Sequence, residues 1–358
     1  MMGLFDNFSS DIGIDLGTAS VLVYVKGKGI VLREPSIVAI DTRTNCIIKV
    51  GREALNMQGR TPGYIKTVKP LKSGVIDQYD VTLKMLQHFI RKACGNMIFK
   101  PRLMICVPTG ISDVEARAVL DAATEAGAKQ TRLIEEPIAA AMGAGLDIYE
   151  PRGNMIIDIG GGTTDIAVIS LGDVVVSESI KTAGDRFDEA IVDYVRRRHR
   201  LLIGDTSAEQ VKLRIGCLDD RMPKKTIDIK GRCLKTNLPR VITLSSAEMV
   251  EALMEPISEV LDAVRLVIER TPPELVGDIM KSGIVMTGGG SRLPGLAKMI
   301  HEVTGIKTRV AEDAVSCVVK GTGMALENPV GSPAEMINMA NERKRREREE
   351  QNGVRNKE

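Results

Sequence analysis

Histidine is scarce and cysteine is scattered in this sequence. Only three histidines occur among 358 residues, and the six cysteines, at positions 46, 94, 106, 217, 233 and 317, include no Cys-x-x-Cys pair. Zinc and iron–sulfur sites are built from clusters of these side chains. We therefore expect no such metal centre. We expect Cys106 and Cys317, which lie in apolar runs, to be buried free thiols of a protein in a reducing compartment.

Long apolar runs and an excess of one charge are also missing. No apolar run approaches the roughly 20 residues that a membrane-spanning helix needs. Net charge is +2, and the terminal stretch 342–358 holds seven of the 49 basic and five of the 47 acidic residues, which leaves 42 of each sign elsewhere. Because nucleic acid would require a dense basic face, we expect no nucleic-acid partner. We expect a cytoplasmic protein that is soluble or bound to a surface.

Two glycine-rich segments of one design lie about half the chain apart. They are Asp15-Leu16-Gly17-Thr18 and Asp158-Ile159-Gly160-Gly161-Gly162-Thr163-Thr164-Asp165. Apolar runs before and after each segment predict two β-hairpins with glycine at the tips. The backbone N–H groups of such tips can cradle an anion, threonine adds a hydroxyl donor, and the aspartates can hold Mg²⁺ through water. Facing hairpins would clamp a triphosphate, whereas the alternative is two ordinary tight turns.

The duplication extends beyond the hairpins. The apolar strand 103–107 meets a glycine turn and a helix from about Ser112, and the strand 284–286 meets Gly288-Gly289-Gly290-Ser291 and a helix from about Leu293. Backbone N–H groups at that second helix start could bind phosphates. Two further helices are predicted, and each begins with acidic residues and ends near two glycines. The first runs from Glu135 to Gly143 and Gly145, and the second from Glu312 to Gly321 and Gly323.

These segments resemble the bacterial actins of the MreB type and their MreB-like (Mbl) paralogues. The resemblance runs from about residue 11 to 326. It is most specific at 12–19, 27–31, 59–63, 136–137, 158–164 and 271–275. Ser20 stands where many members have asparagine, and Asp165 where glutamate is frequent. Both substitutions keep the polarity of the position.

The resemblance implies an α/β, actin-like fold, which is a duplicated ribonuclease H-like fold with the nucleotide in a central cleft. With 43% hydrophobic and 27% charged residues, the chain is long enough for two folded domains. We expect domain I at 1–145 with an insertion at about 33–75, and domain II at 146–327 with an insertion at about 182–250. A C-terminal helix and charged tail would occupy 328–358. Each domain would hold a mixed sheet flanked by helices.

The resemblance also assigns nucleotide-binding residues for ATP and Mg²⁺. Gly184 and Asp185 would approach the ribose, and Glu209 with Lys212 would bracket the sugar and base. Positions 209 and 212 share a helix face, so a surface salt bridge between them is the alternative. The full candidate set is Asp15, Gly17, Thr18, Ala19, Ser20, Asp158, Gly160, Gly161, Gly162, Thr163, Gly184, Asp185, Glu209, Lys212, Gly288, Gly289, Gly290 and Ser291, with Asp15 and Asp158 holding Mg²⁺ through water.

Hydrolysis would require a water that is aligned with the γ-phosphorus. Glu136 matches the family's water-orienting glutamate, and Thr163 matches its hydroxyl partner. The neighbouring Glu135 is an alternative. An acid stabilised by a helix N-terminus would also explain either glutamate.

Aromatic residues make up 3% of the chain, with no tryptophan and five phenylalanines, yet three of the phenylalanines lie in two segments that we expect to be exposed. Leu4, Phe5 and Phe8 would share one face of a short helix, and Met97-Ile98-Phe99 has basic residues on both sides. Apolar tips with basic flanks suit anionic lipid headgroups, and the resemblance implies membrane insertion by such segments. The alternatives are a frayed N-terminus and normal packing of 97–99.

Three functions fit these observations. An ATP-dependent filament former would, by resemblance, lie on the inner face of the membrane, direct cell-wall elongation, pair with itself, and meet elongation-complex proteins such as MreC and RodZ. Its slow ATPase would be coupled to assembly. A small-molecule, sugar-type kinase would need a substrate pocket and a catalytic base. A chaperone-type ATPase would need a peptide-binding domain, for which about 30 residues remain.

Overall fold

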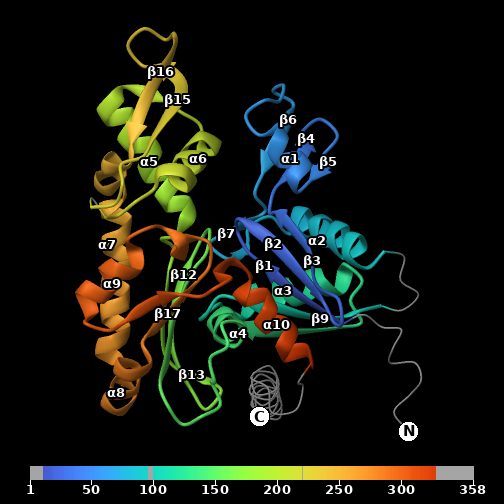
Figure 1. The fold of residues 1–358 in the computed structure, drawn as a ribbon. Helices are drawn as coiled ribbons and strands as arrows, with labels where there is room; N and C mark the ends of the chain where they lie inside the picture. The colour runs from blue at the N-terminus through green and yellow to red at the C-terminus, as the bar shows by residue number, and fades with distance from the viewer. Residues whose placement is uncertain (1–10, 96–99, 220, 328–358) are drawn as a thin grey trace, which may run out of the picture.

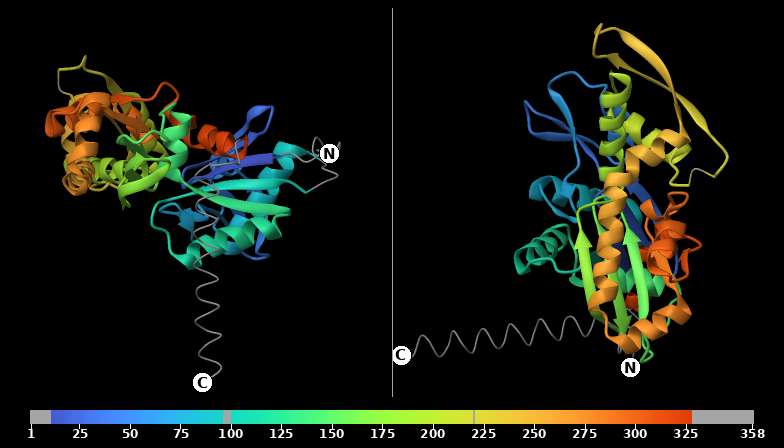
Figure 2. Two further views of the ribbon diagram at one scale, coloured as in Figure 1. Left: turned by 90° about the horizontal axis from the view of Figure 1, so that it is seen from below. Right: turned by 90° about the vertical axis from the view of Figure 1, so that its left-hand side faces the viewer.

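The structure, a computed structural model, describes residues 11–95, 100–219 and 221–327. Two five-stranded mixed sheets form its centre, and each carries a smaller inserted part at the same end of the molecule (Figure 1). In Figure 2 the halves lie side by side when the molecule is seen from below. The chain is therefore divided between two sheet-bearing bodies.

The two sheets repeat one strand order. The first runs β10-β9-β1-β2-β3 and the second β18-β17-β11-β12-β13, with two parallel pairs followed by two antiparallel pairs in each. The strands of the first are β1 (Asp11–Leu16), β2 (Ser20–Val25), β3 (Gly29–Pro35), β9 (Arg102–Val107) and β10 (Gln130–Glu135). Those of the second are β11 (Asn154–Ile159), β12 (Thr164–Ser170), β13 (Asp173–Ile180), β17 (Ile284–Thr287) and β18 (Thr308–Val310). The predicted hairpins are β1–β2 and β11–β12, so the duplication is confirmed.

Helices fill the space between the sheets and cover their outer faces (Figure 1). Helices α4 (Glu136–Gly143) and α10 (Cys317–Glu327) lie in the middle, in a core shared with side chains of both sheets. The outer faces pack against α2 (Tyr79–Cys94) and α3 (Asp113–Glu125) on the first sheet and α7 (Ser246–Arg270) on the second. Helices α8 (Pro273–Ser282) and α9 (Leu296–Thr304) complete the second half.

Strand alternation decides which side chains face the middle layer. In β1, Ile12, Ile14 and Leu16 belong to the hydrophobic core on the outer face of the first sheet, beneath α2 and α3. Asp15 therefore points the other way, because successive strand residues face opposite sides. In β11, Ile157 and Ile159 are in the outer core of the second sheet while Ile156 is in the middle core. Asp158 thus shares the inner face with Asp15.

The inserted parts lie above the sheets in Figure 1. The first comprises α1 (Arg52–Met57) and a sheet of β4 (Val38–Asp41), β5 (Cys46–Val50) and β6 (Ile65–Val68), followed by the hairpin β7 (Leu71–Lys72) and β8 (Val75–Ile76). The second comprises α5 (Gly184–His199), α6 (Asp205–Ile215) and a sheet of β14 (Leu201–Leu202), β15 (Thr226–Cys233) and β16 (Pro239–Ser245). Residues 33–35, which we expected in the first insertion, belong to β3 of the main sheet.

Two predicted helix boundaries were wrong. The segment from Glu312 forms a short 3₁₀ turn, η3 (Ala314–Ser316), and α10 begins only at Cys317, so Gly321 and Gly323 lie inside the helix. Close packing is the reason, because a Cβ on Gly321 would lie 1.8 Å from the carbonyl oxygen of Ala139 in α4. After Gly289 the chain forms the 3₁₀ turn η2 (Gly290–Arg292), and α9 starts at Leu296 rather than near Leu293.

Candidate functional site

A cavity of about 400 Å³ lies where the tips of the two hairpins meet. The tips are in close contact, since a Cβ on Gly161 would lie 2.5 Å from the Cβ of Ala19, and a Cβ on Gly162 would lie 2.5 Å from the Oγ1 of Thr18. Larger residues at these glycines would push the two halves apart. The hairpins therefore face each other, as their sequences predicted.

Most of the predicted site residues line this cavity. The set comprises Asp15, Gly17, Thr18, Ala19, Ser20, Glu136, Asp158, Gly160, Gly161, Gly162, Thr163, Gly184, Asp185, Glu209, Lys212, Gly288, Gly289 and Gly290. Ser291 does not line it, because its buried hydroxyl donates to the carbonyl of Gly288 at 2.7 Å. Of the two candidate glutamates, Glu136 lines the cavity and Glu135 does not.

Buried carboxylates dominate the electrostatics of the cavity. Burial raises the pKa of Asp15 to about 6, against a weaker opposing hydrogen bond from the Cys106 thiol. Burial and the neighbouring Asp165 and Asp15 raise the pKa of Asp158 to about 7, although Thr287 donates to it at 2.6 Å. No lysine or arginine pairs with either aspartate within the described ranges. Such acids favour a cationic ligand, which would restore their charged form.

Glu136 belongs to the same acidic group. It is the first residue of α4 and is buried, and burial followed by the charges of Asp165, Asp15 and Asp158 raises its pKa well above the usual range. Asp165 accepts from the backbone N–H of Thr109 at 3.4 Å across the two halves, and its second carboxylate oxygen is buried without a hydrogen-bond partner. Asp15, Asp158 and Glu136 therefore line the cavity as a group of buried acids from both halves, and Asp165 lies near enough to influence the charge of Glu136 and Asp158.

The start of α5 is tied to the second glycine tip. The backbone N–H of Asp185 donates to the carbonyl of Gly161 at 2.7 Å, and that of Gly184 donates to Gly160 at 3.2 Å. Lys212 of α6 donates to the Gly184 carbonyl at 2.8 Å and to Asp188 at 2.7 Å. Lys212 thus pairs with Asp188, whereas the salt bridge to Glu209 that we held as an alternative is not present among the described contacts.

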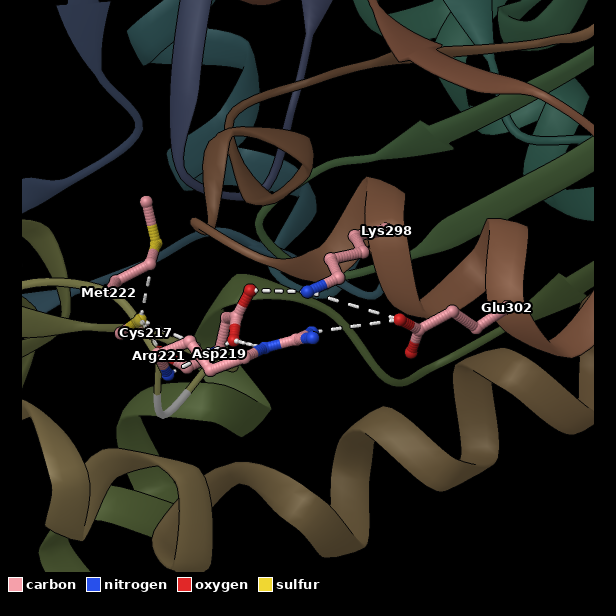
Figure 3. Close-up of polar contacts among 6 residues, drawn as sticks. All are labelled: Cys217, Asp219, Arg221, Met222, Lys298 and Glu302. Carbon is pink, nitrogen blue, oxygen red and sulfur yellow. Dashed lines mark hydrogen bonds and ion pairs between the residues drawn. The ribbon is translucent and has the colours of Figure 1, made fainter.

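At the far end of the cavity an ionic network joins the loop after α6 to α9. The Asp219 carboxylate accepts from Lys298 at 2.7 Å and from the Nε of Arg221 at 3.0 Å, and Glu302 faces both cations (Figure 3). The Leu218 N–H donates to the Pro294 carbonyl at 2.8 Å. Residues of α6 and Pro294 line the cavity, so this network connects two segments that adjoin its wall.

Several lining residues were missed from the sequence, notably Gly74, Asp188, Leu213, Leu293 and Pro294. Asp188 could have been found, because positions three apart on a helix share a face and Asp185 had been assigned. Gly74 carried no local signal. It reaches the site through the β7–β8 hairpin, where its N–H donates to the Thr18 hydroxyl at 2.9 Å.

The predicted membrane contacts lie outside the described residues, and so does the predicted C-terminal tail. These contacts are Leu4, Phe5, Phe8, Met97, Ile98 and Phe99. In the part of the chain that the structure describes, no helix has the length and apolar character needed to cross a bilayer.

The fold matches solved structures of an actin-like protein. Crystal structures of MreB5 of Spiroplasma citri bound to ADP and to AMPPNP each superpose with a TM-score of 0.86 at 39% sequence identity. They cover 90% and 93% of this chain and 97% and 98% of theirs. Two duplicated sheets that face each other across one cavity, with crossed helices between them, therefore define an actin-like fold.

Sequence comparison narrows this class to one family. A family model described as MreB/Mbl protein matches residues 9–332. The chain is 50% identical to the cell shape-determining protein Mbl of Bacillus subtilis over 90% of this chain and 97% of the relative. It is 49% identical to the cell shape-determining protein MreB of Escherichia coli over 89% and 94%. The chain belongs to the MreB/Mbl family of actin-like, cell shape-determining proteins.

Proposed function

We propose that the protein binds ATP with Mg²⁺ in the cavity between the hairpins and polymerises on the inner face of the membrane. The observation that carries the proposal is the pairing of two glycine tips around buried aspartates that have no cationic partner among the described residues. Relatives of known structure, bound to ADP and AMPPNP, support the choice of an adenine nucleotide.

In this proposal the glycine tips hold the phosphates through backbone N–H groups, with hydroxyls from Thr18 and Thr163 beside them. Asp15 and Asp158 would hold a divalent cation through water, because both are buried carboxylates that line the cavity beside the glycine tips. When bound, Mg²⁺ would neutralise charge on the phosphates. Asp185, Glu209 and Lys212 would contact the sugar and base.

For slow hydrolysis, Glu136 would orient the attacking water with help from Thr163. Both line the cavity, and they come from opposite halves of the molecule. Cleft closure would therefore set their separation, which links hydrolysis to the relative position of the two halves. Positioning and electrostatics account for most of phosphoryl transfer, so no covalent intermediate is required.

The cellular part of the proposal follows from the family. We propose filaments of paired protofilaments that contact the membrane through Phe5 or Phe99 and work with elongation-complex proteins such as MreC and RodZ in lateral wall synthesis. The nucleotide state would regulate assembly, with ATP favouring the polymer.

The test is light scattering and pelleting of purified protein with anionic vesicles, with and without ATP. We expect ATP-dependent assembly on vesicles, and loss of vesicle association but not of assembly when Phe5 and Phe99 are replaced by serine. Absence of ATP-dependent assembly would contradict the filament proposal. ATP turnover that rises on addition of a sugar would favour the kinase instead.

A further inference from the structure

A second cavity, of about 610 Å³, adjoins the first and opens between the two inserted parts. Both cavities are lined by Ala19, Ser20, Asp185, Asp188 and Glu209. The second cavity is otherwise walled by polar residues of both inserts, such as Arg52 and Thr67 on one side and Asp205 and Thr206 on the other. It is therefore the approach through which a ligand of the first cavity would enter or leave.

One ion pair crosses this approach. The Lys69 ammonium donates to the Asp185 Oδ1 at 3.0 Å. Lys69 directly follows β6 of the first insert, and Asp185 lies in the first turn of α5 of the second. The side chains are 42% and 35% exposed, so water and salt reach the pair.

Both ends of the pair are fixed to their own half of the molecule. The carbonyl of Pro70, the residue after Lys69, accepts from the N–H groups of Asp77 and Gln78 at 3.0 and 3.1 Å, just before α2. On the other side, the Asp185 N–H is bonded to the Gly161 carbonyl at the glycine tip. A contact between Lys69 and Asp185 therefore restrains one half of the cleft against the other.

We propose that Lys69 is a positioning residue that holds the cleft closed over the nucleotide and slows nucleotide release. The inference rests on the proposed nucleotide site and adds a residue from outside the first cavity. Lys69 holds one oxygen of Asp185 and leaves the rest of that side chain at the edge where the two cavities meet. An exposed pair is weak, so it would lower the release rate only severalfold and let the cleft open within turnover.

The test measures the dissociation rate of a fluorescent N-methylanthraniloyl-ADP that is chased with unlabelled ADP and Mg²⁺. Lys69→Met should release the probe about two to five times faster than wild type, and Lys69→Arg should restore the wild-type rate. Lys66→Met is the matched control, since Lys66 is exposed on β6 three residues earlier and makes no ion pair within the described residues.

Salt provides a second readout that a general loss of stability would not reproduce. Raising ionic strength from about 0.05 M to about 0.5 M should speed release from wild type more than from Lys69→Met, because screening removes the same contact as the substitution. Equal nucleotide dissociation rates for Lys69→Met and Lys66→Met would overturn the inference about Lys69 without contradicting the proposed nucleotide site. Failure of the wild type to bind the probe would instead overturn the proposed function.

Discussion

At the scale of single residues, two aspartates determine the electrostatics of the cavity. Asp15 and Asp158 end equivalent strands, and alternation turns both toward the layer between the sheets. Burial makes their charged forms unfavourable and raises the pKa of both carboxyls. A bound cation would reverse that preference, so the empty and loaded proteins should depend on pH differently.

The nucleotide-free protein should lose stability as pH rises from 5 to 7.5. The pKa of Asp158 is about 7 in the fold against 3.8 for the free side chain, so the folded state holds a proton that the unfolded state has released. The contribution of this protonation to the free energy of unfolding is fully present below about pH 4 and is lost as pH rises through 7. Differential scanning fluorimetry should show Tm falling by about 3 °C over that range.

Asp158→Asn should flatten this slope, because the amide does not titrate. Carboxyls whose pKa is lowered in the fold, such as Glu34 and Glu248, have already reached their full contribution above pH 5 and do not obscure the effect. A Tm that stays level or increases between pH 5 and 7.5 in the wild type would contradict the proposed electrostatics.

Glu136→Gln should lower ATP turnover by about 100-fold, since a positioned acceptor for water typically contributes that much. ATP affinity should stay the same or increase, because the substitution removes a carboxyl whose ionisation burial and the neighbouring acids already disfavour. Phosphate release and nucleotide titration measure the two effects separately. Glu135→Gln is the control, and loss of turnover in that variant alone would reverse the assignment.

At the scale of elements, the crossing of α4 and α10 joins the two halves. A Cβ on Gly143 would lie 1.8 Å from the Cys317 carbonyl oxygen, and one on Gly321 would lie equally close to Ala139. Ala139, Ala140 and Ala141 are fully buried at the same contact. Small residues at these positions allow the backbones of α4 and α10 to pack in direct contact, so the layer between the two sheets is thin.

Gly321→Ala should destabilise the protein by about 1–3 kcal/mol, because the added methyl overlaps backbone that cannot move aside. The matched control is Gly277→Ala in α8, where nothing lies within 4 Å of the added carbon. That substitution should stabilise by about 0.5–1 kcal/mol through the higher helix propensity of alanine. Urea unfolding measures both, and equal effects would show that the crossing is not close-packed.

The sequence predicted the duplicated strands and hairpins better than it predicted the helix boundaries that depend on tertiary packing. The two hairpins, β9 and β17 appear where periodicity and glycine predicted them, because these signals are local. The helix predicted from Glu312 begins only at Cys317 and continues past Gly321 and Gly323. These glycines look like helix ends in sequence, yet they allow close contact with α4 and Tyr24. Long-range packing of this kind leaves no local pattern.

At the scale of the whole molecule, the site exists only when the two halves meet. Glu136 and Asp15 come from one half, Asp158 and Thr163 from the other, and Gly161 contacts Ala19 across the boundary. The duplicated glycine motif predicted Asp15, Asp158 and Thr163, whereas Glu136 and Ala19 were assigned from the family resemblance. The sequence could not indicate Gly74, Leu293 or the Lys69–Asp185 contact, since their positions depend on how separate elements are arranged in three dimensions.

This shared construction would provide a physical basis for the proposed coupling of nucleotide binding to assembly. A nucleotide bound to both hairpins would favour the closed arrangement of the halves, and a polymer contact that prefers this arrangement would be strengthened by the same amount. Assembly should therefore follow occupancy of the cavity.

Isothermal titration calorimetry of purified protein with ATP in the presence and absence of Mg²⁺ tests the central claim most directly. The account predicts one site per chain, tighter binding with Mg²⁺, and loss of most of that Mg²⁺ dependence in both Asp15→Asn and Asp158→Asn. No heat of binding in the wild type, or an unchanged Mg²⁺ dependence in the two variants, would contradict it.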